Sequence, residues 1–391
     1  MNMHAANIVQ LDEAIFEDDL TPGTNLMHGQ YEIESFLASG GFGITYTAYD
    51  SLDRRVVIKE CYPQNFCRRQ NTSVLPRSRN YSGDLESIVQ LFAREAFNLS
   101  KVRHPNIVRV HQVFEENNTA YMVLDYVEGV DLLDTLENNP ASLTPEKLTA
   151  YLLKILSAVE HVHEQGMLHR DISPDNIVIS KTGEPILIDF GAARDQAREK
   201  TSRLLSSLHV IKDGYSPQEF YIEGSEQGPS SDLYSLAASF YHLITGALPP
   251  HSQTRLAAFA TKQQDPYVPL ANRIDGYSEN FLAAVDKALS IMPAERIQSA
   301  AEWIDIIQQD SSATSGEKES AQAPEDEVVI KVGTHKKLPV LVELEVEKVD
   351  TSATSLDFEV KETPVIVALV ARTVAAVLDA IDAFRSRGKE V

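Results

Sequence analysis

The chain has 391 residues, a formal net charge of −22 at pH 7 and a hydrophobic content of 43%. This length suits one large domain with a buried core and a shorter remainder. A surface this acidic repels phosphate backbones and anionic lipid headgroups, which argues against nucleic-acid binding and membrane adhesion. Cys61 and Cys67 are the only cysteines, so the sequence predicts no disulfide framework and a cytoplasmic location.

The first 30 residues are mixed and polar. Met1–Gln10 lacks the cationic start and the apolar core of a signal peptide. We therefore expect residues 1–30 to form a loose N-terminal arm.

Alternation of apolar and polar residues begins after this arm and predicts β-strands. Tyr31–Leu37 and Ile44–Tyr49 alternate on either side of a glycine-rich turn, which predicts a hairpin. The elements predicted next are a strand at Arg55–Lys59, an irregular insertion at 61–87, a helix at Leu91–Val102, and strands at Ile107–Val113 and Tyr121–Val127.

Glycines crowd the turn of this hairpin, where residues 37–45 read Leu-Ala-Ser-Gly-Gly-Phe-Gly-Ile-Thr. Without Cβ atoms, the backbone can fold closely over a polyphosphate and direct its N–H groups at the oxygens. A dinucleotide-binding fingerprint would open a helix instead of joining two strands. An ordinary hairpin turn is the alternative interpretation, since a glycine-rich turn alone is a weak signal.

One lysine, Lys59, ends the otherwise apolar strand Val56–Ile58. A buried ammonium needs a counter-charge, and Glu95 in the predicted helix can supply it. The hypothesis is that Lys59 grips the α- and β-phosphates of a nucleotide while Glu95 orients it. A solvated lysine at the end of a strand is the alternative.

Helical spacing replaces strand alternation after Gly129. Pro145–Gln165 carries apolar residues at helical spacing, with Thr144 as the expected N-cap. Further helices are predicted at Asp232–Thr245, Glu279–Ser290 and Ala300–Gln309. A mostly β part therefore precedes a mostly α part, which predicts an α+β fold.

The sharpest signal lies on a loop between short predicted strands. Residues 169–176 read His-Arg-Asp-Ile-Ser-Pro-Asp-Asn, and residues 189–191 read Asp-Phe-Gly. Asp171 can accept the proton of a substrate hydroxyl, and Asn176 can turn to a metal ion. Asp189 offers a carboxylate to Mg²⁺, which prefers oxygen ligands and needs few protein groups. Asp-Phe-Gly alone is a turn tripeptide, but the joint occurrence in this order indicates phosphoryl transfer.

These motifs resemble the eukaryotic-type protein kinases, specifically the bacterial Ser/Thr protein kinase branch. The runs Gly40–Tyr46 and Ala120–Gly129 are similar to that branch as well. The resemblance spans residues 31–309 and implies a bilobal protein-kinase fold, with a small β-rich N-lobe (31–127) and a larger helical C-lobe (130–309). It also implies transfer of the γ-phosphoryl group of ATP to Ser or Thr hydroxyls of protein substrates in bacterial signalling, with Mg²⁺.

The resemblance further implies roles for single residues. Leu124 stands at the gatekeeper position, Glu219 is expected to pair with Arg296, and Asp232 is expected to brace the catalytic loop. ATP contacts are expected from Leu37, Ala38, Gly40, Gly41, Phe42, Gly43, Thr45, Val57, Lys59, Asp125, Val127, Asp131 and Val178. Catalytic roles are expected for Asp171, Lys59 and Glu95, and metal ligation for Asn176 and Asp189.

Several residues depart from the family pattern. Ala38 replaces the first glycine of the turn, and Thr45 and Val57 replace the usual Val and Ala around adenine. Ser173 stands where these kinases carry a lysine directed at the γ-phosphate, and losing that charge removes one transition-state contact. A pseudokinase scaffold that binds partners without phosphotransfer therefore stays open as an alternative. A small-molecule kinase fits less well, because such relatives usually lack the activation segment and the Glu219–Arg296 pair.

The segment Ala192–Asp213 is rich in hydroxyl groups, contributed by Thr201, Ser202, Ser206 and Ser207. A phosphate on it could pair with Arg170 and order the segment. A flexible, unmodified loop is an equally compatible interpretation.

The C-terminal residues differ in composition from the rest. Residues 310–328 have the composition of a linker, and residues 329–391 predict a short appendage with one strand and one helix. The apolar stretch Val365–Ile381 is interrupted by Arg372 and Asp379, whereas a spanning helix needs about 20 mostly apolar residues. No membrane span is predicted, and the appendage could dock a regulatory partner or pack on the kinase lobe.

Overall fold

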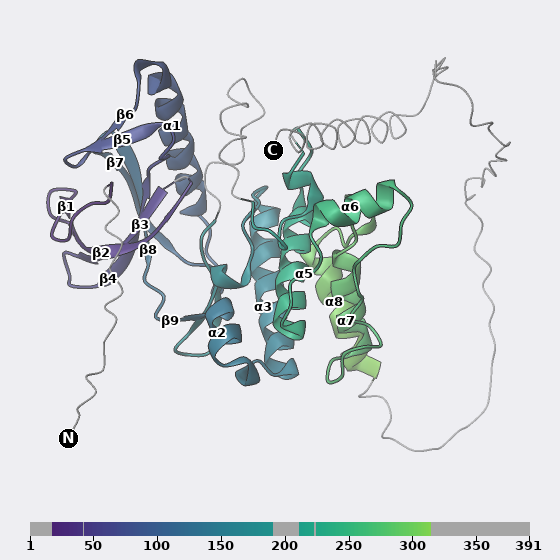
Figure 1. Cartoon of the computed structure of the whole chain (residues 1–391). Helices are drawn as coiled ribbons and strands as arrows, with labels where there is room; N and C mark the ends of the chain where they lie inside the picture. The colour runs from purple at the N-terminus through teal and green to yellow at the C-terminus, as the bar shows by residue number, and fades with distance from the viewer. Residues whose placement is uncertain (1–17, 42, 191–210, 223, 314–391) are drawn as a thin grey trace, which may run out of the picture. The chain divides into compact units, whose positions relative to one another are not determined.

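A computed structural model of the chain describes residues 18–41, 43–190, 211–222 and 224–313 (Figure 1). These residues lie within the first of two compact units, Met1–Thr314 and Ser315–Val391. The predictions for Phe42, Gly191, the four candidate phosphorylation sites, the linker beyond residue 313 and the appendage fall outside the described residues. Among those residues, no helix combines the length and apolar character that crossing a membrane requires.

An antiparallel sheet of six strands, in the order β1-β2-β3-β4-β8-β7, forms the N-terminal part of the domain (Figure 1). Its strands are β1 (Asn25–Leu26), β2 (Tyr31–Gly40), β3 (Gly43–Asp50), β4 (Arg55–Cys61), β7 (Val110–Glu116) and β8 (Thr119–Asp125). The predicted glycine-rich hairpin is confirmed as β2–β3, with Gly40 opposite Gly43 at its end.

Strand β8 is buried from Thr119 to Leu124, which explains its nearly continuous apolar sequence. Helix α1 (Ser82–Leu99) packs against β7 and β8 through an apolar face that includes Ile88, Phe92 and Ala96. The structure therefore places α1 beside the sheet that carries Lys59.

Two sequence predictions for this part are wrong. The irregular insertion at 61–87 contains a hairpin of β5 (Cys67–Gln70) and β6 (Ser73–Pro76), and α1 begins at Ser82. Arg69 of this hairpin donates to the fully buried carboxylate of Glu60 on β4, at 3.0 Å. Strand β5 is four residues long and carries two arginines, so its sequence shows no apolar alternation that would predict a strand.

The N-terminal arm is packed where the structure describes it, contrary to the expectation of a loose segment. Strand β1 pairs with β2, and the side chains of Leu20 and Leu26 are buried. The Leu20 N–H donates to the hydroxyl of Tyr46 at 3.1 Å. Leu20 and Leu26 therefore join the core of the N-terminal part.

The C-terminal part is mostly helical, as predicted. Its helices are α2 (Leu132–Asn138), α3 (Pro145–Glu164), α5 (Pro229–Thr245), α6 (Ser252–Ala260), α7 (Glu279–Ala288) and α8 (Ala300–Ala313). The Thr144 hydroxyl accepts from the Lys147 N–H and caps α3, which confirms that prediction. Helix α5 is buried continuously from Ser230 to Tyr241, so it forms the centre of this part.

A small sheet joins the helices to the catalytic loop. It has the order β11-β10-β9, with β9 at Gly129–Asp131, β10 at Ile177–Ser180 and β11 at Pro185–Leu187. The catalytic loop ends where β10 begins, and Asp189 follows two residues after β11. This antiparallel pair therefore brings Asn176 and Asp189 to the same end of the sheet.

Candidate active site

One buried carboxylate, that of Asp232, holds the catalytic loop (residues 169–176) in place. Asp232 of α5 accepts the backbone N–H groups of His169 and Arg170, both at 2.8 Å. Burial alone would raise the pKa of Asp232, but the hydrogen bond from His163 and these N–H groups hold it below its usual value. The predicted bracing role of Asp232 is confirmed.

The His169 ring links the two catalytic segments. Its Nε2 lies 3.0 Å from the carbonyl oxygen of Ile188, which accepts only from an N–H, so Nε2 carries the proton. Its Nδ1 then accepts the backbone N–H of Asp171 at 3.2 Å. Burial lowers the pKa of His169 and so favours this neutral form.

Asp171 and Asn176 contact each other. The Asn176 side-chain nitrogen donates to the backbone oxygen of Asp171 at 2.7 Å and to its carboxylate at 3.2 Å. Both residues are partly or fully buried. The amide therefore fixes the carboxylate of Asp171, and its nitrogen faces the loop.

Lys59 and Asp189 also meet. The Lys59 ammonium lies 2.6 Å from Oδ1 of Asp189, whose φ of +60° is uncommon for a residue other than glycine. Such backbone strain concentrates at functional sites. The expected ion pair between Lys59 and Glu95 is not formed among the described residues, because the carboxylate of Asp189 is the one that reaches the ammonium.

The predicted ATP-binding residues lie on the elements around this pair. Ala38 faces Thr45 across the hairpin, Thr45 faces Lys59, and Val57 faces Leu124 in the sheet. A Cβ on Gly43 would lie 2.3 Å from the carbonyl oxygen of Glu60, so this position requires glycine. Leu37, Gly40 and Gly41 lie in the hairpin, Asp125 ends β8 with Val127 following it, and Asp131 and Val178 face each other in the small sheet.

Asp131 has a structural role that the prediction did not include. Its Oδ1 accepts the backbone N–H of Asp134 at 2.8 Å and caps α2. We expect Asp131→Ala to lower the free energy of unfolding by about 1 kcal/mol, and Asp131→Asn to retain the cap. Urea denaturation of the two variants measures the difference, and equal stabilities would contradict the cap.

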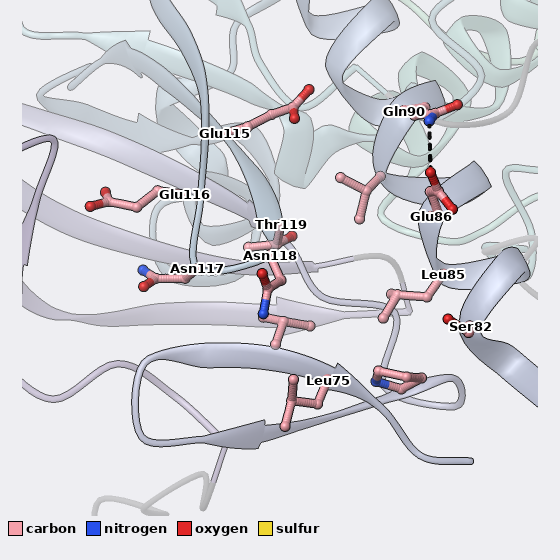
Figure 2. A pocket seen from close by; sticks show the side chains of 13 residues that line it. Leu75, Ser82, Leu85, Glu86, Gln90, Glu115, Glu116, Asn117, Asn118 and Thr119 are labelled. Atoms are coloured by element: carbon pink, nitrogen blue, oxygen red, sulfur yellow. Dashed lines mark hydrogen bonds between the residues drawn. The ribbon is translucent and has the colours of Figure 1, made fainter. Parts of the chain in front are cut away.

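Figure 2 shows a separate pocket of about 580 Å³ between the β5–β6 hairpin, α1 and the β7–β8 turn. Its lining includes the carboxylates of Glu86, Glu115 and Glu116, and Gln90 donates to Glu86 at 3.4 Å. None of the predicted ATP-binding residues lines it. This pocket is therefore distinct from the predicted nucleotide site.

Comparison with protein families decides the classification. The family described as the protein kinase domain matches residues 31–306. The chain belongs to the protein kinase family. Membership implies use of ATP and, typically, of a divalent metal ion. The predicted bilobal fold is confirmed, with a β-rich N-lobe and a helical C-lobe.

Curated relatives and a solved structure agree with this classification. The chain is 32% identical to the Ser/Thr-protein kinase PksC of Streptomyces coelicolor, over 71% of this chain and 48% of the relative. It is 31% identical to PrkC of Bacillus subtilis, over 63% of this chain and 35% of that relative. The chain thus spans half or less of these relatives' length. A structure of the apo form of PpkA-294 has a TM-score of 0.63 and 34% identity, and covers 74% of this chain and 99% of that chain.

Sequence reasoning missed one residue that contacts the catalytic loop. Lys212 reaches the catalytic loop, where its ammonium lies 2.7 Å from the hydroxyl of Ser173 and 2.7 Å from Oδ2 of Asp175. Lys212 lies 39 residues after Ser173 and 37 residues after Asp175 in the sequence. Only the departure at Ser173 marked this place in the sequence.

Proposed function

We propose that this chain is an ATP-dependent protein kinase that transfers the γ-phosphoryl group to Ser or Thr hydroxyls of proteins in bacterial signalling, in the cytoplasm. The observation that carries the proposal is the meeting of two pairs, Asp171 with Asn176 and Lys59 with Asp189, in a chain of the protein kinase family. The cytoplasmic location is supported by the two cysteines, which are both free.

Asp171 orients the substrate hydroxyl and accepts its proton. Its carboxylate accepts from the amide of Asn176, and its backbone N–H donates to Nδ1 of the His169 ring. A carboxylate held in one place lowers the barrier because the hydroxyl is positioned before reaction. Positioning and charge stabilisation together account for most of the catalysis in phosphoryl transfer.

Lys59 and the glycine-rich hairpin hold the triphosphate. Lys59 on β4 pairs in the register with Thr45 on the hairpin strand β3. Glu95, on α1 beside the sheet, would orient Lys59 once the carboxylate of Asp189 binds Mg²⁺ instead of the Lys59 ammonium. Adenine and ribose would then contact the remaining predicted residues, namely Leu37, Ala38, Val57, Asp125, Val127, Asp131 and Val178.

Asn176 and Asp189 would hold Mg²⁺, and their chemistry fits that ion. Both side chains offer hard oxygen donors, and the Asn176 nitrogen is already used toward Asp171, which leaves its oxygen for a ligand. No cluster of three His, Cys, Asp or Glu side chains that could hold a metal occurs in the described ranges. Mg²⁺ fits a site with so few protein ligands, because water and phosphate oxygens complete its coordination. It would neutralise phosphate charge there.

The test is transfer of label from [γ-³²P]ATP to protein by the full chain. We expect labelled phosphoserine or phosphothreonine with Mg²⁺, and none when EDTA removes the metal. Equal labelling by the wild type and by Asp171→Ala would contradict the catalytic assignment and favour a scaffold that does not transfer phosphate.

A further inference from the structure

We propose that Lys212 supplies a positive charge at the phosphoryl-transfer site, where the catalytic loop carries no cationic side chain from Asp171 to Asn176. The Lys212 ammonium contacts the Ser173 hydroxyl and Oδ2 of Asp175, and lies 3.9 Å from Oδ1 of Asp171. It therefore sits beside the carboxylate to which we assign the substrate proton. The inference rests on the proposed kinase function and adds a residue to it.

The charge balance of the residues from Asp171 to Asn176 creates the need for such a cation. Residues 171–176 read Asp-Ile-Ser-Pro-Asp-Asn and contain two carboxylates and no cationic side chain. The Lys59 ammonium is engaged with Asp189 on the neighbouring segment. Phosphoryl transfer spreads negative charge over the moving group, and a preorganised cation stabilises that charge strongly in a site sheltered from water.

Lys212 is held in place by its own backbone. Its carbonyl accepts the N–H groups of Tyr215 at 3.1 Å and Ser216 at 2.9 Å, and its N–H donates to the Ser216 hydroxyl at 3.0 Å. Gly214 in this turn has a φ of +86°, and a Cβ there would lie 3.1 Å from Leu248. The turn is therefore fixed, which suits a group that must be positioned before reaction.

The groups around the ammonium match its charge. Burial alone would raise the pKa of Asp175, but the hydrogen bond and charge of Lys212 hold it below its usual value. The Ser173 hydroxyl is fully buried and leaves room for the ammonium beside it. A lysine at position 173 would place a second ammonium in the same space. Ser173 and Lys212 thus form a complementary pair.

A purely structural reading makes a different prediction. If Lys212 only ties residues 211–222 to the loop through Asp175, removing it lowers thermal stability, and a lysine at position 173 cannot restore turnover. If Lys212 supplies charge to the reaction, a lysine on the loop can replace it. The exchange of the two side chains separates these readings.

The experiment measures turnover of [γ-³²P]ATP by the full chain for Lys212→Ser, for Ser173→Lys and for the double exchange. We expect Lys212→Ser to lower kcat by about 10²–10³-fold, with Mg-ATP affinity within about threefold of the wild type. The double exchange is expected to turn over at least about tenfold faster than Lys212→Ser, while Ser173→Lys alone, which keeps Lys212, is expected to be no faster than the wild type. Lys154→Ser is the matched control, since it removes another C-lobe lysine paired with a carboxylate at 2.6 Å.

Each outcome bears on one of the two proposals. A wild type without turnover contradicts the proposed kinase function. An active wild type with Lys212→Ser within about threefold of its kcat overturns the role of Lys212 alone, as does a double exchange no faster than Lys212→Ser. Should Lys212→Ser not fold, Lys212→Gln and Lys212→Arg replace it in the test, because both keep a long side chain at this position. Charge dependence then requires Lys212→Arg to be the faster of the two, and equal rates overturn it.

Discussion

Replacing Asp171 by asparagine is expected to lower kcat by about 10²–10⁴-fold, the range that a positioned general base contributes. Asparagine has the same shape, and the Asn176 amide can still donate to its side-chain oxygen and to the backbone oxygen of residue 171. The loop therefore keeps its contacts. Only the ability to accept the substrate proton and the negative charge are lost, so the effect falls on kcat.

Steady-state turnover of [γ-³²P]ATP at saturating protein acceptor measures this effect. Asp53→Asn is a matched control, because Asp53 lies in an exposed turn between β3 and β4 and has a φ of +56° that asparagine tolerates. We expect the control to keep wild-type turnover. An Asp171→Asn variant as fast as that control would show that the carboxylate does not take part in the reaction.

The order of strands and helices was readable from the sequence because periodicity is a local property. Tyr31–Leu37 alternates and became β2, and the helical spacing after Thr144 became α3 with the predicted cap. The strands β5 and β6 were missed because residues such as Arg69 are ordered by a partner in another strand, Glu60. Local pattern carries no information about such a pairing.

The same distinction applies to the site. Asp171, Asn176 and Asp189 could be named as candidates because their spacing is local and their order is specific. The partner of Lys59 was not, since Glu95 and Asp189 both offer a carboxylate and only the folded geometry decides between them. Lys212 was missed for a related reason, because it reaches the loop from a segment 37 residues beyond Asp175.

Replacing Arg296 by methionine is expected to lower the free energy of unfolding by about 3–5 kcal/mol, the usual cost of breaking a buried ion pair from one side. Arg296 donates to both oxygens of Glu219, at 2.6 and 2.9 Å, and to the carbonyl oxygens of Ser290, Ser230 and Ile291. Its side chain is fully buried. Among the residues that the structure describes, methionine leaves the buried carboxylate of Glu219 with only the Ser231 hydroxyl as a donor.

Guanidinium chloride unfolding of the purified chain measures this loss. Lys287→Met is the control, because Lys287 forms an exposed ion pair with Glu302, and exposed pairs stabilise little. The double variant Glu219→Gln with Arg296→Met should recover part of the loss, since it removes the unpaired charge. A loss for Arg296→Met no larger than that of the control would contradict the structural role of the pair.

Arg296→Met is also expected to lower turnover in the protein that remains folded. Glu219 and Lys212 belong to the same described segment, 211–222, and Arg296 anchors that segment to the turn before α8. Once the anchor is lost, the segment can leave the loop and carry the Lys212 ammonium away from Ser173. If Lys212 acts as proposed, kcat falls in Arg296→Met while Mg-ATP binding persists, because Lys59 and the glycine-rich hairpin lie on the other lobe.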